Sequence, residues 1–121
     1  MQGIIDFHAH AFPDKVAASA IPYLEEEGDI KAIHDGRIAS LLQMMDREGV
    51  AKSVICSIAS RPTQFEAILS WSKQIRSDRL IPFPSFHPCD PQALEHISMI
   101  LSKIIYSNVL SPNYCQILKR G

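Results

Sequence analysis

The first residues that could do chemistry are two histidines, His8 and His10, separated by one alanine. They lie in an alternating apolar and polar segment, residues 4–10, that is typical of a β-strand. Side chains of a strand repeat every second residue, so both imidazoles share one face with Asp6. Neutral imidazole is a preferred nitrogen ligand of zinc and similar divalent cations. The spacing alone is a weak signal, because two half-buried or surface histidines would give the same pattern. The position of the pair at the carboxyl end of the first expected strand is what favours a shared metal ion.

Two further polar residues are candidates for supporting roles. Asp6 lies on the same expected face as the histidine pair, where a carboxylate could orient a ligand imidazole or simply bond to the backbone. His87 falls at the end of another expected strand, near the presumed rim of an active site. His87 is a candidate for substrate contact, but capping or packing beside Pro88 is the favoured role.

The other histidines and cysteines offer no second metal site. Cys89 is two residues from His87, but a structural zinc ion needs four ligands and no cluster completes that set. Cys56, in an apolar stretch, is expected to be a small core residue. His34 and His96 are expected at surface positions.

Apolar stretches predict the strands that position these residues, namely residues 4–10, 50–59 and 80–87, with residues 104–110 as a candidate fourth. Residues 11–35, interrupted by Pro13 and Pro22, are expected to form a long irregular loop with a short helix through Ala20.

Helices are expected between the strands. Apolar residues at helical spacing follow Arg37, and Gly49 is placed to end that helix in the left-handed conformation. A second helix should begin at a capping box formed by Thr63 and Glu66 and stop near Asp78. A third should follow a cap at Asp90 and a proline, with a buried stripe of Leu94, Ile97 and Leu101.

Composition limits the class of protein. The net charge of -1 gives no electrostatic case for nucleic acid. No stretch reaches the apolar length of a membrane span, and no secretory signal is recognisable. The three cysteines form no Cys-x-x-Cys pair, which argues against a disulfide framework. We expect a cytoplasmic α/β protein with residues 1–121 as a single domain.

The segments that contain the histidines resemble a known family. Residues 5–13, 45–50, 54–56 and 86–91 are similar to the amidohydrolase-related family, the metal-dependent TIM-barrel hydrolases that include aminocarboxymuconate semialdehyde decarboxylase. The resemblance covers roughly residues 4 to 103. It implies the N-terminal part of a (β/α)8 barrel, with about three to four parallel β/α units and the barrel not closed.

The resemblance also implies an activity. In the family the first-strand histidines bind a divalent metal, usually zinc, and here only His8 and His10 can receive that role. A small-molecule amide, ester or lactone would be hydrolysed, or a related decarboxylation catalysed. The remaining ligands and the catalytic aspartate come from later strands, and the register with the family is lost over residues 104–121. We therefore expect a truncated chain that is inactive alone and self-associates through its exposed sheet edges.

Two other interpretations remain open. Histidinol-phosphatase-like (PHP-type) phosphoesterases also begin with His-x-His on a first barrel strand, but a serine-aspartate-glycine turn usually follows, and residues 11–14 do not show it. The other is a small non-catalytic α/β domain that binds a ligand or partner.

Overall fold

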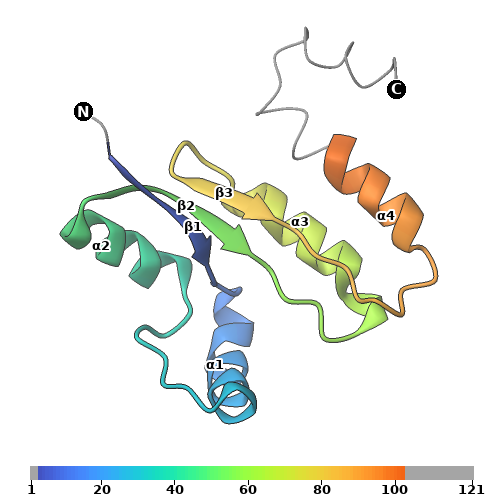
Figure 1. The fold of residues 1–121 in the computed structure, drawn as a ribbon, viewed down its shortest axis with the longest axis horizontal. Coiled ribbons are helices and arrows are strands. Elements are labelled where there is room, and N and C mark those ends of the chain that lie inside the picture. The colour runs from blue at the N-terminus through green and yellow to red at the C-terminus, as the bar shows by residue number, and fades with distance from the viewer. Residues whose placement is uncertain (1–2, 103–121) are drawn as a thin grey trace, which may run out of the picture.

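The computed structural model describes residues 3–102 and shows an α/β fold in which a three-stranded parallel sheet alternates with helices (Figure 1). The strands are β1 (Ile4–Ala9), β2 (Val50–Cys56) and β3 (Leu80–Phe83). The helices are α1 (Asp14–Gly28), α2 (Ile38–Glu48), α3 (Phe65–Ile75) and α4 (Ala93–Ile100), with a 3-10 turn at Pro62–Gln64. The expected open parallel sheet is confirmed. The candidate fourth strand at residues 104–110 lies outside the described residues.

The sheet order is β1-β2-β3, so β2 is central. Ala9 pairs with Ile55, and Cys56 pairs with Phe83, at the carboxyl ends of the strands. Because all three strands are parallel, these ends lie along one edge of the sheet. Residues that follow the strands are therefore brought together there.

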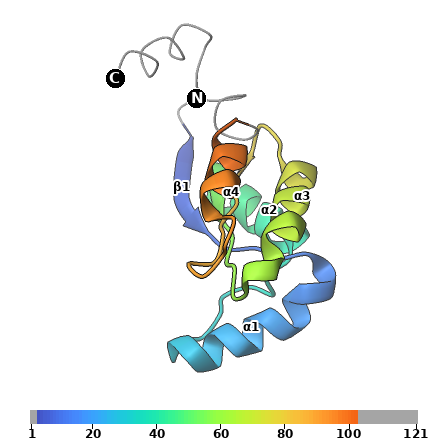
Figure 2. The ribbon, with the colours of Figure 1, turned by 90° about the vertical axis from the view of Figure 1, so that its right-hand side faces the viewer.

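The core lies between this sheet and its helices. Ala9, Ile55 and Leu80 of the three strands form one buried cluster with Leu41 and Met45 of α2. Figure 2 shows α2 and α3 together on one side of β1. β1 itself leaves large apolar side chains in solvent, at exposed fractions of 62%, 46% and 74% for Ile4, Ile5 and Phe7.

Helix α2 follows the sequence prediction closely. Leu41 and Met45, one helical turn apart, are almost completely buried. Gly49 has a φ of 70° and donates its backbone N–H to the Met45 carbonyl, which ends the helix in the left-handed conformation. This sharp stop lets β2 begin at Val50.

Helix α1 corrects the expectation of an irregular loop. It runs unbroken for 15 residues from Asp14 to Gly28 with Pro22 inside it, and ends where Asp29 adopts a φ of 48°. Pro13 is the residue before the helix, and Asp14 places a negative charge in its first turn, where the helix dipole favours it. Pro22 removes one backbone donor, and the alanine, leucine and glutamate residues around it favour the helix enough to continue it.

The strands are shorter than predicted, because a polar residue or a proline follows each of their last residues. β2 ends at Cys56 although Ser57 still donates its backbone N–H to the Phe83 carbonyl at 3.2 Å. β3 ends at Phe83, where Pro84 removes the next donor. The segment up to His87 is therefore a loop.

The expected capping box at Thr63 and Glu66 was wrong. The side chain of Gln64 takes that role instead, since its Oε1 accepts backbone N–H groups of Ser60 at 2.7 Å and Arg61 at 3.0 Å. A 3-10 turn therefore precedes α3.

The expected buried stripe of α4 was also wrong. Leu94 and Leu101 are 83% and 38% exposed, whereas His96 is only 7% exposed. The apolar residues of α4 in contact with α3 are Met99 and Ile100, beside Phe65 and Leu69. Among residues 3–102, no helix combines the length and the apolar run needed to cross a bilayer.

Candidate metal site

The two first-strand histidines converge. Their Nε2 atoms lie 3.0 Å apart, and their rings meet edge to face with centroids separated by 4.8 Å. The strand explains why the two side chains converge: the two-residue repeat aims His8 and His10 the same way, and β1 ends between them at Ala9. His8 is exposed and His10 is half-buried.

The ring of His10 is held by the neighbouring strand. Its Nδ1 lies 2.8 Å from the carbonyl oxygen of Cys56, the last residue of β2. A carbonyl can only accept, so Nδ1 carries the hydrogen and the Nε2 of neutral His10 presents a lone pair. Metal-ligating histidines are commonly held in this way by a backbone carbonyl.

The spacing of the two nitrogens fits a shared metal ion. Nitrogens at about 2.0–2.1 Å from one tetrahedral zinc lie roughly 3.3 Å apart, close to the 3.0 Å between the two Nε2 atoms. Among residues 3–102, however, no group of three or more His, Cys, Asp or Glu side chains is placed to hold a metal. His8 and His10 can therefore supply two of the ligands that zinc requires.

Asp6 takes the second of its two predicted roles. Its Oδ1 accepts the backbone N–H of His8 at 3.0 Å. The carboxylate therefore fixes the backbone that carries the first histidine.

A hollow of about 330 Å³ opens beside the pair, between β1, α1, the loop after α1, and α2. Its polar wall includes three residues that the sequence did not single out for the site: Glu25, Lys31 and His34. Its apolar wall is formed by the following residues: Ala9, Phe12, Ile21, Leu24, Ile30, Ala32, Ile33, Leu41 and Met44.

Two residues of this wall are fixed by hydrogen bonds to the backbone. The Oε1 of Glu25 accepts the N–H of Ala32 at 2.7 Å, and the Nδ1 of His34 accepts the N–H of Gly36 at 2.9 Å. His34 was expected at a surface helix or loop position; it lies in the loop after α1, where it is half-buried and lines the hollow.

His87 is not among the residues that line this hollow. It is half-buried, and its Nδ1 accepts the backbone N–H of Cys89 at 3.1 Å. This is a local turn contact of the capping kind, and substrate contact by His87 stays a prediction. Cys56 is half-buried and Cys89 exposed, and both are free thiols.

A second polar cluster lies at the start of α4. The Nδ1 of His96 lies 2.5 Å from the Oδ2 of Asp90, and the His96 ring stacks on Phe65 of α3 with centroids 3.7 Å apart. His96 was expected at the surface, and this was wrong because the stacking draws its side of α4 inward.

Asp90 is ionised more readily than an ordinary aspartate. Burial alone would raise its pKa, but the hydrogen bonds from the Gln92 backbone and the His96 ring outweigh that cost and hold the pKa of the Asp90 carboxyl below its usual range. The cluster therefore ties the loop after β3 and α4 to α3.

Comparison of the chain with protein-family models, curated proteins and solved structures finds no match. The fold and the geometry of the histidine pair therefore carry the functional interpretation.

Proposed function

We propose that this chain provides the first metal-binding strand of a metal-dependent hydrolase of the amidohydrolase type. The substrate is a small molecule with an amide, ester or lactone group, and decarboxylation is the nearest chemical variant. The observation that carries the proposal is the 3.0 Å approach of the His8 and His10 Nε2 atoms at the carboxyl end of a parallel strand. Active sites of β/α barrels lie at that end.

A bound divalent metal, zinc by the family resemblance, would supply a water of lowered pKa as a nucleophile near neutral pH. The chain's own residues prepare this site. The Cys56 carbonyl orients His10, and the Asp6 carboxylate holds the backbone at His8. In the conformation described, the His10 lone pair is met by the His8 Nε2–H, so metal binding requires the His8 hydrogen to move to Nδ1.

The hollow beside the pair would receive the substrate. Its wall is mainly apolar, with Glu25 and Lys31 as charged side chains beside the pair. The further ligands and the catalytic aspartate that the family takes from later strands have no counterpart among residues 3–102. Two imidazoles alone should bind zinc weakly, so we propose that activity needs additional ligands.

Cobalt titration tests the metal proposal, because Co²⁺ occupies zinc sites and reports its ligands by visible absorption. The wild type should show saturable binding that His8→Ala and His10→Ala each abolish. His87→Ala is the matched control, since this histidine does not line the hollow, and it should bind cobalt as the wild type does. Unchanged binding in a His8→Ala/His10→Ala double variant would reject the proposal.

A further inference from the structure

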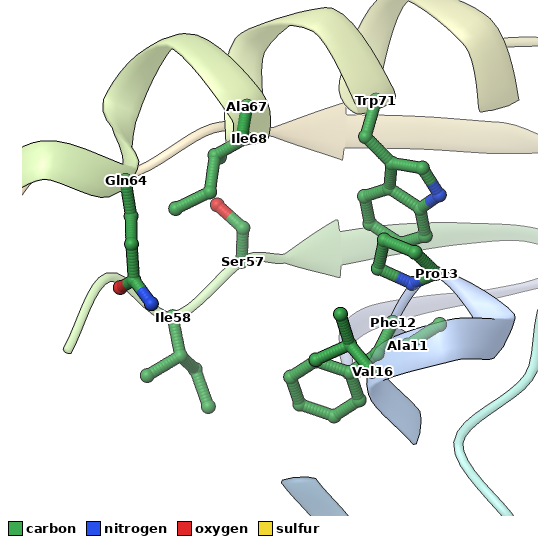
Figure 3. A pocket seen from close by; sticks show the side chains of 10 residues that line it. All are labelled: Ala11, Phe12, Pro13, Val16, Ser57, Ile58, Gln64, Ala67, Ile68 and Trp71. Carbon is green, nitrogen blue, oxygen red and sulfur yellow. The ribbon is translucent and has the colours of Figure 1, made fainter. Parts of the chain in front are cut away.

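A second cleft, separate from the histidine hollow, lies between the start of α1 and one face of α3 (Figure 3). The strand ends contribute Ala11 and Phe12 after β1, and Ser57 and Ile58 after β2. The remaining lining residues come from the two helices and their starts: Pro13, Val16, Gln64, Ala67, Ile68 and Trp71.

The cleft has the size and chemistry of a site for a small apolar group. Its volume is about 150 Å³, and apolar cavities of roughly that volume bind benzene. In Figure 3, the rings of Phe12, Pro13 and Trp71 gather at one end, and Ile58 and Ile68 lie toward the other. Val16 is 44% exposed and Ile58 40%, so a ligand can enter from solvent.

Two polar atoms at the cleft, the Ser57 hydroxyl oxygen and the Gln64 Oε1, are bonded to neighbouring protein groups. The Ser57 hydroxyl donates to the Phe83 carbonyl at 3.0 Å and accepts the Ser85 backbone N–H at 2.7 Å. The Oε1 of Gln64 accepts the two backbone N–H groups that precede α3. A ligand in the cleft would therefore gain mainly from burial of apolar surface.

The cleft adjoins the histidine hollow through Phe12, which lines both. The backbone N–H of Phe12 donates to the Gly36 carbonyl at 2.8 Å, which fixes this dividing residue. Ser57, at the cleft, directly follows Cys56, whose carbonyl orients His10. The two spaces thus meet at the end of β1, and the end of β2 contacts His10 on one side and lines the cleft on the other.

We propose that this cleft is a specificity site that holds a phenyl-sized apolar group of the substrate, while the reacting carbonyl lies in the hollow beside His8 and His10. The inference rests on the proposed function and narrows its substrates to amides, esters or lactones with an aryl or compact alkyl substituent. A polar or charged substituent would be disfavoured, because it would lose hydrogen bonds to water on entering a mainly apolar cleft.

Trp71, the single tryptophan of the chain, reports on the cleft directly. Titration with benzyl alcohol, monitored by tryptophan fluorescence, should saturate with a Kd on the order of 1 mM, as expected for so small a ligand. Acetamide should give no saturable change.

Ala67 is an exposed residue of α3 that lines the cleft, so Ala67→Leu should weaken benzyl alcohol binding about tenfold or more. Ala39→Leu, an exposed position on α2 outside the cleft, should leave it unchanged.

Circular dichroism verifies that both leucine variants are folded. Absence of saturable benzyl alcohol binding in the wild type would overturn the inference, as would equal binding by Ala67→Leu and the wild type. The His8→Ala variant should keep benzyl alcohol binding while losing cobalt. If the wild type binds benzyl alcohol but no metal, the proposed hydrolase function fails and the apolar site stands without it.

In the zinc-loaded protein, the link between the two spaces can be tested with hydroxamates, which bind metal at one end. Phenylacetohydroxamate should bind more tightly than acetohydroxamate, and Ala67→Leu should remove that difference. Equal affinity of the wild type for the two hydroxamates would show that the cleft does not serve a ligand held at the histidine pair.

Discussion

The Nδ1 atom of His10 lies 2.8 Å from the carbonyl oxygen of Cys56, and this contact joins the ends of β1 and β2 at the candidate metal site. The hydrogen bond does two things at once. It connects neighbouring strands, and it fixes which ring nitrogen of His10 is left to bind a metal. The structural and the chemical roles of His10 can be separated by mutation.

His10→Asn should keep the first role and lose the second. The Asn side-chain amide can donate to the Cys56 carbonyl from near the position of Nδ1, but it has no equivalent of Nε2. We expect near wild-type stability without metal binding. His10→Ala loses both roles, and its free energy of unfolding should be about 0.5–1.5 kcal/mol lower because a hydrogen bond is removed. Urea denaturation combined with cobalt titration measures both effects, and metal binding by His10→Asn would contradict the assignment.

The burial of Leu41 predicts a large loss of stability on truncation. Its side chain is 0% exposed, between the sheet and α2. Leu41→Ala should cost about 2–5 kcal/mol in the free energy of unfolding, because it removes buried methyl groups and leaves a cavity. Leu94→Ala is the matched control at 83% exposure, and should change the free energy by less than about 0.5 kcal/mol. Similar losses for both variants would mean that the described core is wrong.

Replacing Gly49 with alanine should destabilise the protein because of the left-handed backbone conformation at this residue. Its φ is 70°, and an added Cβ would meet nothing within 4 Å, so any penalty comes from conformation. Gly49→Ala should destabilise the protein by about 1 kcal/mol. Gly28→Ala, at the last residue of α1, should cause no such loss because alanine favours a helix and the Ile30 side chain, 3.3 Å from an added Cβ, is exposed and can shift. Thermal unfolding of the two variants provides the comparison, and a neutral Gly49→Ala would argue against the left-handed cap.

The lowered pKa of Asp90 predicts a contribution to acid stability. A carboxyl whose pKa is lower in the folded state stabilises the protein fully above its ordinary pKa of 3.8, and this stability is lost as the pH falls through the folded value. Wild-type stability should therefore fall from about pH 5 downward more steeply than that of Asp90→Asn.

Asp35→Asn is the control for this measurement. The Arg37 backbone N–H and the Ser40 side chain also lower the pKa of Asp35, but its side chain is 54% exposed and screened by water. Urea denaturation at several acidic pH values should show a smaller change for Asp35→Asn than for Asp90→Asn. Equal slopes for the wild type and Asp90→Asn would contradict the proposed role of the buried pair.

The periodicity of side chains and the order of apolar segments in the sequence predicted several parts of this structure. The two-residue repeat placed His8 and His10 on one face, and the spacing of Leu41 and Met45 with Gly49 after them predicted α2 and its end. The alternation of strands and helices predicted the parallel sheet. The first two depend only on neighbouring residues and their conformational preferences. The parallel sheet joins distant residues, but it follows from the crossover helix that separates each pair of strands.

The parts that were missed depend on distant contacts. The burial of His96 requires Phe65 from α3 and Asp90 from the preceding loop, which no periodicity in α4 reveals. The walls of the histidine hollow required α1 to continue past Pro22, and a proline in a helical pattern does not say whether the helix stops.

Anomalous diffraction at the zinc edge from a zinc-soaked crystal shows directly whether His8 and His10 share a metal ion. We predict one anomalous peak at about 2.0–2.1 Å from the Nε2 atoms of both His8 and His10, with the His10 Nδ1 still bonded to the Cys56 carbonyl. A zinc ion bound through only one of these histidines, or a peak elsewhere with the pair still bonded to each other, would contradict it.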